Sequence, residues 1–496
     1  MSAVAEQTAV DFARQRDVVA ALRAFLPGPA VLWETEDVTP YECDGLSAYR
    51  QVPMVVALPD TEVEVRRILR TCHGLRVPVV ARGAGTGLSG GALPLGNGVL
   101  LSLARFMRIL EVDAGARTAR VQPGVRNLAI SEAAAPHGLY YAPDPSSQLA
   151  CSIGGNVAEN SCGVHCLKYG LTVHNILKLR VATVEGEILD IGSDGLDAAG
   201  YDLLALMTGS EGLLGVVTEV TVKLLPKPEF AQVVMAAFDD VESAGNAVAG
   251  IIAAGIIPAG LEMMDQAATR AVEDFVHAGY RTDVASILLC ESDGTHEEVA
   301  DEIRRVQDVL ERTGAVQTQV SRDEKERLLF WAGRKAAFPA SGRISPDYYC
   351  MDGTIPRKRL GEVLRRIAEL ERKYDLRCAN VFHAGDGNLH PIILYDGNKP
   401  GELARTEEFG GEILEICLQV GGTITGEHGV GVEKINQMCI QFGSSELATF
   451  HAIKRAFDEH GLLNPGKMVP TLHRCAEFGR MHVHAGHQRF PQLPRF

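Results

Sequence analysis

The sequence predicts an α+β protein, and three observations support this fold class. From residue 99 to residue 223 the pattern is mostly that of short strands and turns. From residue 230 to residue 430 long helical patterns alternate with strand patterns, a mixture typical of α+β domains. Between these stretches, Pro226 and Pro228 end an alternating strand and indicate the end of a first domain. A chain of 496 residues has room for about three domains, or for two with insertions.

The first part begins with a surface helix, because apolar residues recur at helical spacing until Leu26 and Pro27 end the run. Thr61 is expected to cap a second helix, with Glu62 and Glu64 in its first turn, where acidic side chains interact favourably with the helix dipole. The elements expected here are a helix over 5–26, a strand over 53–58, a helix over 61–70, a strand over 77–81, and a hairpin that turns at 185–186.

The second part combines longer helices with strands and ends in an irregular, histidine-rich tail. Its expected helices cover 241–254, 297–312, 357–374 and 445–459, and its expected strands include ASILLCES and NVFHAG. The predicted division of the chain is an N-terminal helical segment (1–50), a first domain (51–228), a second domain (229–430) and a C-terminal segment (431–496).

The composition is that of an ordinary soluble globular protein, with 46% hydrophobic and 22% charged residues. The net charge of −15 argues against nucleic acid as the main partner and against attraction to an anionic membrane. The N-terminus has no apolar signal region, and the most apolar stretch, 247–261, is too short to span a bilayer. With eleven cysteines in such a chain, a reduced, cytoplasmic setting is expected.

A dense glycine loop indicates a phosphate site. Gly83, Gly85, Gly87, Gly90 and Gly91 fall within nine positions, and glycine lets backbone N–H groups approach an anion closely. Part of the loop fits the G-x-G-x-x-G string of dinucleotide-binding folds. That string must open a helix, however, whereas this loop continues into a strand, VLLSL. We therefore predict a phosphate-binding loop of another kind, with a merely tight turn as the alternative.

Two further glycine-rich segments indicate a large anionic cofactor. They are PDPSSQLACSIGGNVAENSCG at 143–163 and TGSEGLLGVVTEV at 208–220. Together RGAGTGLSGG, PDPSS, SIGGNVAENSCG with Lys168-Tyr169-Gly170, and TGSEGLLGVVTEV resemble the FAD-linked oxidase family, which has the flavin fold of vanillyl-alcohol oxidase. The resemblance covers nearly the whole chain.

This resemblance implies a two-part FAD-binding domain, an α+β substrate or cap domain over 229–430, and a C-terminal segment that returns to the FAD domain. In the family the first loop holds the pyrophosphate, the next two segments lie along the flavin and ribityl chain, and the last lines the adenine end. FAD is expected to be non-covalent, because no His lies in or beside the glycine loop and Cys162 and Cys166 are expected to be packed residues. The implied FAD-binding residues are Arg82, Gly83, Gly85, Thr86, Gly87, Leu88, Pro143, Ser146, Gly154, Asn156, Gly212, Gly215 and Val217.

Two histidine motifs predict a metal and a base. Residues 383–390 are HAGDGNLH and residues 426–429 are GEHG. Imidazole and carboxylate are ligands for zinc-type divalent ions, and a catalytic site leaves a coordination position open. Gly385 and Gly387 break any helix, so a strand end and a loop are expected to carry the histidines. A structural His pair is the alternative.

The resemblance to the 2-hydroxy-acid dehydrogenase branch of the family assigns these residues. It implies that His383, His390 and Glu427 bind the metal and that His428 is the base. It also implies that Asn388 contacts the substrate. A W-x-x-R motif of that branch corresponds to Trp331 and Arg334, and the Arg would hold the substrate carboxylate, since its planar fork pairs with both oxygens.

One departure from the branch narrows the substrate. The members that act on 2-hydroxyglutarate carry a Lys at about the place of Cys350, so a second substrate carboxylate would lose its partner here. The resemblance therefore implies a small monocarboxylic acid and the oxidation of glycolate to glyoxylate. The base would take the hydroxyl proton, the metal would polarise the hydroxyl, and the C2 hydride would pass to flavin N5.

The electrons are expected to leave through partner proteins. The chain lacks the cysteine run of ferredoxin-type clusters. The resemblance implies a second flavin-domain-like subunit and an iron–sulfur subunit, with contact to the inner membrane through them. The tail histidines His482, His484 and His487 are a possible docking or metal element, and an ordinary surface terminus is the favoured alternative.

Three other functions remain open from the sequence. D-lactate differs from glycolate by one methyl group, which a pocket discriminates weakly, so a flavin-dependent D-lactate dehydrogenase is the nearest alternative. A metal-dependent hydrolase would use the histidine motifs alone. A non-catalytic scaffold subunit would lack a working base, whereas His428 and Arg334 are both present.

Overall fold

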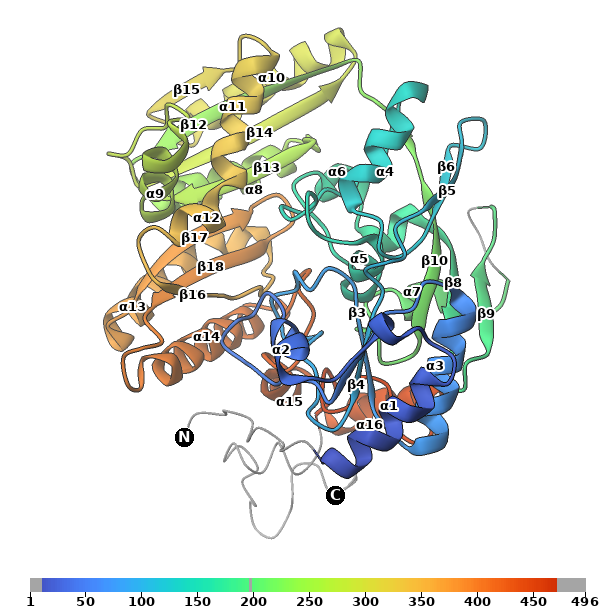
Figure 1. Ribbon diagram of the computed structural model, residues 1–496. Helices are drawn as coiled ribbons and strands as arrows, with labels where there is room; N and C mark the ends of the chain where they lie inside the picture. Colours follow the sequence, from blue (N-terminus) through green and yellow to red (C-terminus); the bar gives the residue numbers. More distant parts are fainter. Residues whose placement is uncertain (1–10, 196–198, 471–496) are drawn as a thin grey trace.

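The structure describes residues 11–195 and 199–470, and Figure 1 shows it as a computed structural model. In these residues the strands form four sheets, with four, five, two and seven strands. The seven-stranded sheet and its helices form one lobe at the upper left of Figure 1, and the smaller sheets lie together on the other side. This mixture of helices and sheets confirms the predicted α+β class.

The four-stranded sheet has the order β1-β2-β4-β3, and β4 runs parallel to both β2 and β3. α1 and α3 pack on it through buried side chains such as Leu22 and Ile68. Thr61 and Glu64 form reciprocal hydrogen bonds at the start of α3, which confirms the predicted cap. The elements are α1 (Phe12–Arg23), η1 (Gly28–Ala30), β1 (Val31–Leu32), α2 (Thr35–Val38), η2 (Thr39–Tyr41), β2 (Val55–Ala57), α3 (Glu62–Leu75), β3 (Val79–Arg82) and β4 (Val99–Ser102).

The five-stranded sheet is antiparallel, with the order β5-β6-β10-β8-β9. β8 and β9 form the predicted hairpin, and Gly186 in its turn has a φ of 72°. β7 and β11 pair to form a separate two-stranded sheet, and β11 directly follows β10 in the chain. The elements are β5 (Ile109–Asp113), β6 (Thr118–Val121), α4 (Asn127–Ala134), η3 (Ala135–His137), β7 (Leu139–Tyr140), α5 (Ile153–Glu159), α6 (Cys166–Tyr169), η4 (Thr172–Asn175), β8 (Ile176–Ala182), β9 (Ile188–Gly192), α7 (Leu203–Met207), β10 (Val216–Lys223) and β11 (Leu225–Pro226).

The seven-stranded sheet is antiparallel and buried on both faces. Its order is β15-β12-β14-β13-β17-β18-β16. Alternate residues of β12 belong to different core clusters: Val234 packs in the cluster with α8, α10, α13 and α14, and Val233 packs in the cluster with α9, α11 and α12. The strands are β12 (Phe230–Phe238), β13 (Gly260–Asp265), β14 (Ser286–Gly294), β15 (Gln317–Val320), β16 (Asp347–Cys350), β17 (Arg377–His383) and β18 (Asn388–Tyr395).

Four helices of this half of the chain were predicted from the sequence, whereas the helices over 266–276, 324–335, 337–341, 402–419 and 435–441 were not. The four predicted helices appear as α8, α10, α13 and α16, with every end within three residues of its predicted place. The helices are α8 (Val241–Ala253), α9 (Gln266–Val276), α10 (His296–Arg312), α11 (Glu324–Lys335), α12 (Ala337–Ser341), η5 (Arg357–Arg359), α13 (Leu360–Tyr374), α14 (Glu402–Gln419), α15 (Ile435–Gln441) and α16 (Ser444–Phe457).

Residues after α16 contact the glycine-loop part of the chain. Val79 of β3 donates to the Leu462 carbonyl (2.8 Å), and Asn464 donates back to Val79 (2.8 Å). The buried ammonium of Lys467 donates to the carbonyls of Gly91 (2.9 Å) and Leu93 (2.5 Å). The end of the described chain therefore supports the outer side of the glycine loop.

Two of the predicted features involve residues that the structure does not describe. The first residues of the predicted helix 5–26 and the tail histidines His482, His484 and His487 lie outside the ranges that the structure describes. In the described ranges, none of the helices combines the length and apolar character that crossing a bilayer requires.

Candidate active site

A cavity of about 350 Å³ lies between the glycine loop and the second half of the chain. Pockets for small molecules and cofactors start at about this volume. The glycine loop, residues between 145 and 161, and residues between 207 and 217 line one side. The other side is lined by Lys335, Phe338, Pro339, Tyr348, His390, Glu427 and His428.

The glycine loop follows β3 and turns sharply. Gly85 has a φ of 71°, a backbone conformation that side chains rarely permit. A Cβ atom on Gly83 would stand 2.1 Å from Ser152 Oγ, so a side chain there would displace the Ser152 hydroxyl. The Ser152 hydroxyl in turn accepts the N–H of Ala84 (3.3 Å). A loop of this shape fits a phosphate group held by backbone N–H groups.

The residues implied in FAD binding gather at this cavity, with one exception. Pro143 is not among the described lining residues, and its carbonyl accepts a hydrogen bond from Asn127 (3.0 Å). Asn127 also donates to the side chain of Asn156 (3.0 Å), which does line the cavity. The other lining residues of this group are Arg82, Gly83, Gly85, Thr86, Gly87, Leu88, Ser146, Gly154, Gly212, Gly215 and Val217.

His383, His390 and Glu427 converge on one point. His383 ends β17 and His390 lies in β18, and the strand register places both side chains on the same face of the hairpin. Glu427 Oε1 lies 2.9 Å from His390 Nε2 and 3.3 Å from His383 Nε2. All three are buried, and their donor atoms lie within 4.8 Å of one another. Two imidazole nitrogens and a carboxylate oxygen in this arrangement fit a zinc-type ion.

Glu262 of β13 fixes one of these histidines. Its Oε1 lies 2.7 Å from His383 Nδ1, so the other nitrogen, Nε2, points to Glu427. Burial alone would lower the pKa of His383, but the carboxylates of Glu262 and Glu427 outweigh it and raise this pKa well above its ordinary value. Burial alone would raise the pKa of Glu427, but His383 and His390 hold it well below its ordinary value. A carboxylate behind a histidine is the usual support of a metal ligand.

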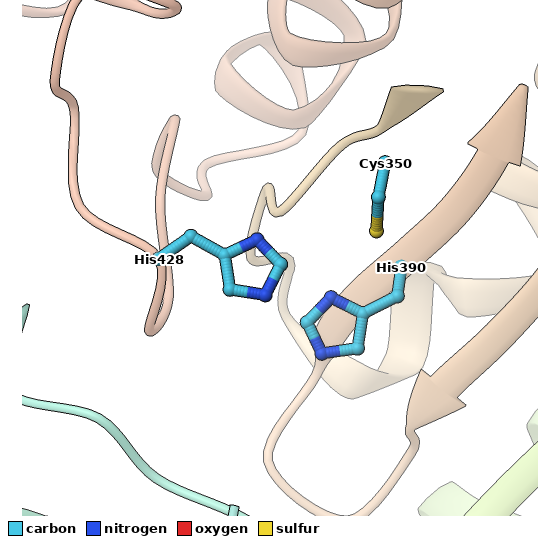
Figure 2. Close-up of side chains that lie close together, drawn as sticks. All are labelled: Cys350, His390 and His428. Carbon is cyan, nitrogen blue, oxygen red and sulfur yellow. The ribbon is translucent and has the colours of Figure 1, made fainter. Parts of the chain in front are cut away.

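His428 lines the cavity beside His390. Their rings stack with centroids 4.9 Å apart and planes inclined by 12°. Burial lowers the pKa of His428 to about 4, so its imidazole is neutral near pH 7 and can accept a proton. Figure 2 shows these two rings with the thiol of Cys350 pointing toward His390. Cys350, the residue from which a small monocarboxylic substrate was expected, is therefore a neighbour of the site.

Arg334 and Asn388 lie deeper than expected. Neither is among the described residues that line the cavity. Arg334 is 1% exposed, and its guanidinium forms an ion pair with Glu262 (2.7 Å). Asn388 is buried beside Gly426, and its side-chain amide has no hydrogen-bond partner among the described residues. Trp331 donates its indole N–H to Glu291 and packs in the core.

Several residues of this region were not predicted from the sequence. Glu262 lies in an ordinary strand, LEMMD, and no spacing rule marks it. Cys162 is buried as expected, but its Sγ lies 3.0 Å from Glu427 Oε2 and its backbone N–H also donates to this carboxylate (3.1 Å). Asp352 follows the aromatic strand DYYC, and Glu211 lies in TGSEG; both contact the segment of Glu427 and His428. Contacts between segments so far apart leave no local pattern.

Comparison with known proteins identifies both halves of the chain. Residues 53–192 match the FAD binding domain, and residues 227–468 match the C-terminal domain of FAD linked oxidases. Over 479 residues the chain is 67% identical to the glycolate oxidase subunit GlcD of Escherichia coli (strain K12), which covers 97% of this chain and 96% of that protein. It is 31% identical to a D-lactate dehydrogenase of Anaerostipes hadrus, over 85% of this chain and 90% of that one.

Solved structures confirm the predicted flavin fold. A structure of p-cresol methylhydroxylase with bound substrate superimposes with a TM-score of 0.79 at 18% identity, over 94% of this chain and 98% of that one. At this identity the likeness shows the fold alone. The matches to sequence families and relatives go further, and together they show that the chain is an FAD-dependent oxidoreductase that belongs to the family of FAD-linked oxidases.

Proposed function

We propose that this chain oxidises glycolate to glyoxylate as the FAD-carrying subunit of a glycolate oxidase. The observation that carries the proposal is a cavity in which a neutral histidine, His428, faces the FAD cradle beside a buried His–His–Glu cluster. The 67% identity to a GlcD subunit favours glycolate, since the D-lactate dehydrogenase reported above is only 31% identical. The two FAD-linked oxidase matches argue against a hydrolase that works without flavin.

Each group in the cavity has a separate function in the proposed reaction. Bound FAD supplies the acceptor for the C2 hydride, and the backbone of the glycine loop holds its phosphates. A divalent ion held by His383, His390 and Glu427 would supply Lewis acidity at the substrate hydroxyl, and zinc fits this donor set. His428 accepts the hydroxyl proton as general base. Loss of one proton and one hydride converts glycolate to glyoxylate.

The visible spectrum of the purified chain tests the proposal. Under anaerobic conditions, glycolate should bleach the flavin absorption, and it should do so faster than D-lactate. Faster bleaching by D-lactate would replace glycolate with D-lactate as the substrate. A flavin that neither acid bleaches would contradict the proposed reaction, while a folded chain without flavin would contradict the cofactor as well.

The carboxylate anchor can be identified by two neighbouring substitutions. We propose Arg334 as the anchor, supported by its Nε, which is buried without a hydrogen-bond partner among the described residues. Lys335 is the competing cation, because it lines the cavity itself. We expect Arg334→Lys to raise KM for glycolate by about 10-fold to 100-fold, because a hydrogen bond to a charged group contributes about 1.5–3 kcal/mol. Steady-state kinetics of Arg334→Lys and Lys335→Met decide between them, and a larger KM increase in Lys335→Met would transfer the role.

The FAD cradle makes a separate prediction. Gly83→Ala should lower the FAD content of the purified protein, because the new Cβ would displace the Ser152 hydroxyl, which holds the N–H of Ala84 in the glycine loop. The ratio of flavin to protein absorbance measures this. Gly74→Ala is the matched control, since its Cβ has open space and the site lies in a helix. Normal FAD content in Gly83→Ala would show that the loop position is not critical.

The remaining expectations become part of the same proposal. FAD is held non-covalently, and the chain divides into the FAD-binding and substrate regions at residue 228, with 431–496 returning to the FAD region. A GlcD subunit belongs by name to a glycolate oxidase with other subunits. We propose that a second flavin-domain-like subunit and an iron–sulfur subunit take up the electrons, in the cytoplasm and next to the inner membrane. Co-purification of the chain with such partners tests this assembly.

A further inference from the structure

The segment that carries Glu427 and His428 is held by a buried carboxylate. We name residues 425–431 the Glu-His loop. Asp352, which follows β16, is fully buried and accepts the backbone N–H groups of Gly426 (3.1 Å), Glu427 (3.2 Å) and His428 (2.9 Å). It also accepts the hydroxyl of Thr425 (2.5 Å). Successive N–H groups that converge on one anion form a nest, and here the anion belongs to the protein.

A buried ammonium compensates the charge of Asp352. Lys434 Nζ lies 3.2 Å from Asp352 and donates to the carbonyl of Gly429 (2.8 Å), which belongs to the Glu-His loop. Both side chains have an exposed fraction of 0%. Removing one partner of a buried ion pair strongly destabilises a protein, because the other charge is left buried without a partner. Since Lys434 also binds the Gly429 carbonyl, the pair holds the Glu-His loop in place.

A second buried carboxylate holds the other end of the Glu-His loop. Glu211 lies in TGSEG and accepts the N–H groups of Val430 (2.7 Å) and Gly431 (2.7 Å). It is 4% exposed and also lines the FAD cavity. Gly429, between the two carboxylates, has a φ of 79° and turns the chain from one to the other. Glu211 thus connects the loop to the FAD cradle, and Asp352 connects it to the seven-stranded sheet.

We infer that Asp352 and Glu211 are positioning residues that set where Glu427 and His428 stand relative to the flavin. This inference deepens the proposed function and rests on it. Neither carboxylate needs to contact the substrate, because each acts through the backbone of the Glu-His loop. Displacement of a reacting group by about 1 Å lowers rates by about 100-fold, so two anchors on opposite parts of the fold are a strong constraint.

A purely structural role would give different results from a positioning role. Loss of a buried carboxylate lowers the stability of the fold in either case. In a positioning role, the affinity for zinc falls because Glu427 moves, and kcat falls more than KM rises because His428 moves. The support behind a metal ligand typically changes metal affinity by about 10-fold to 100-fold. Zinc affinity therefore supplies a readout besides activity.

The experiment compares Asp352→Asn and Glu211→Gln with a matched control in the FAD-loaded protein. The control is Asp458→Asn, since Asp458 is a buried carboxylate that also binds a lysine, Lys454 (2.6 Å), and a backbone N–H. Zinc affinity is measured by competition with a chromophoric chelator, and flavin reduction by glycolate is measured in single turnover. Thermal unfolding and FAD content are recorded for every variant.

The inference predicts that both test variants keep FAD but bind zinc 10-fold to 100-fold more weakly and reduce flavin at least 10-fold more slowly. In its FAD-loaded form, Asp458→Asn should lose stability but keep zinc affinity and the rate of flavin reduction within 2-fold of wild type. Zinc affinity and rate within 2-fold of wild type in both test variants, or equal losses in the control, would overturn the inference. If Asp352→Asn does not fold, Thr425→Val, which removes one bond to Asp352, is judged on the same criteria with a smaller expected loss.

The same data separate this inference from the proposed function. A wild-type chain that binds no zinc refutes the metal, and the rate of flavin reduction then decides the inference. A wild-type chain that glycolate does not reduce refutes the substrate, and zinc affinity then decides. If the wild type shows neither property, the inference falls together with the proposed function.

Discussion

His428→Ala should lower the rate of glycolate-dependent flavin reduction by about 100-fold to 10,000-fold, the usual contribution of a general base. The imidazole lines the cavity, and burial keeps it neutral near pH 7. FAD should remain bound, because the implied FAD-binding residues come from other segments. Stopped-flow absorbance under anaerobic conditions measures the rate, and the flavin spectrum before mixing measures FAD content.

A histidine elsewhere provides the control for this substitution. His451 lies on α16, forms a hydrogen bond with the carbonyl of Pro470 (3.2 Å), and is not among the residues that line the cavity. His451→Ala should reduce flavin at the wild-type rate. A His428→Ala protein that still turned over at a tenth of the normal rate or faster would assign the base to another residue.

If the proposed divalent ion binds at His383, His390 and Glu427, Glu427→Gln should release it and slow flavin reduction by about 1,000-fold. The substitution keeps the size of the side chain but removes the negative charge between His383 and His390. A metal that polarises a hydroxyl contributes several kcal/mol, and about 4 kcal/mol corresponds to this factor. Metal analysis of the purified protein and single-turnover rates give the two measurements.

Metal removal by a chelator and a control substitution at a second glutamate test whether flavin reduction needs the divalent ion. Wild-type protein treated with a chelator should show the same loss, and added zinc should restore its rate but not that of Glu427→Gln. Glu371→Gln is the matched control, because the carboxylate of Glu371 accepts a backbone N–H, that of Cys378 (2.6 Å), as Glu427 accepts that of Cys162. Full activity in metal-free wild-type protein would remove the metal from the reaction.

Local sequence patterns predicted the elements of this fold well, because their physical causes are local. The cap of α3 depends on Thr61 and Glu64, three residues apart, and it forms as predicted. The prediction ended this helix at residue 70, but the helix continues to Leu75 because Cys72 extends the buried stripe of Ile68 and Leu69. The residue that ends it, Arg76, has a left-handed φ of 56°, which no sequence signal indicated.

The residues of the candidate site that belong to a sequence motif could be predicted. The residues whose role depends on buried contacts between distant segments could not. Glycines 385 and 387 indicated correctly that the histidine motif is not helical and that His383 ends a strand, but His390 lies within β18 and not in the expected loop. Arg334 was expected at the substrate, but the structure pairs it with Glu262, a residue from a strand without any motif. Asp352 and Glu211 contact a loop more than seventy residues away, and such contacts arise from packing of whole layers.

The contacts of Lys467 determine when, during translation, the glycine loop can be fully supported. Its ammonium binds the Gly91 carbonyl behind the glycine loop, and 376 residues separate the two along the chain. At roughly 5–20 residues per second, the ribosome makes this lysine roughly 20 to 75 s after the glycine. Until then the outer side of the loop lacks this support. A nascent chain therefore lacks this contact, and we expect the complete FAD cradle to form only when translation is nearly finished.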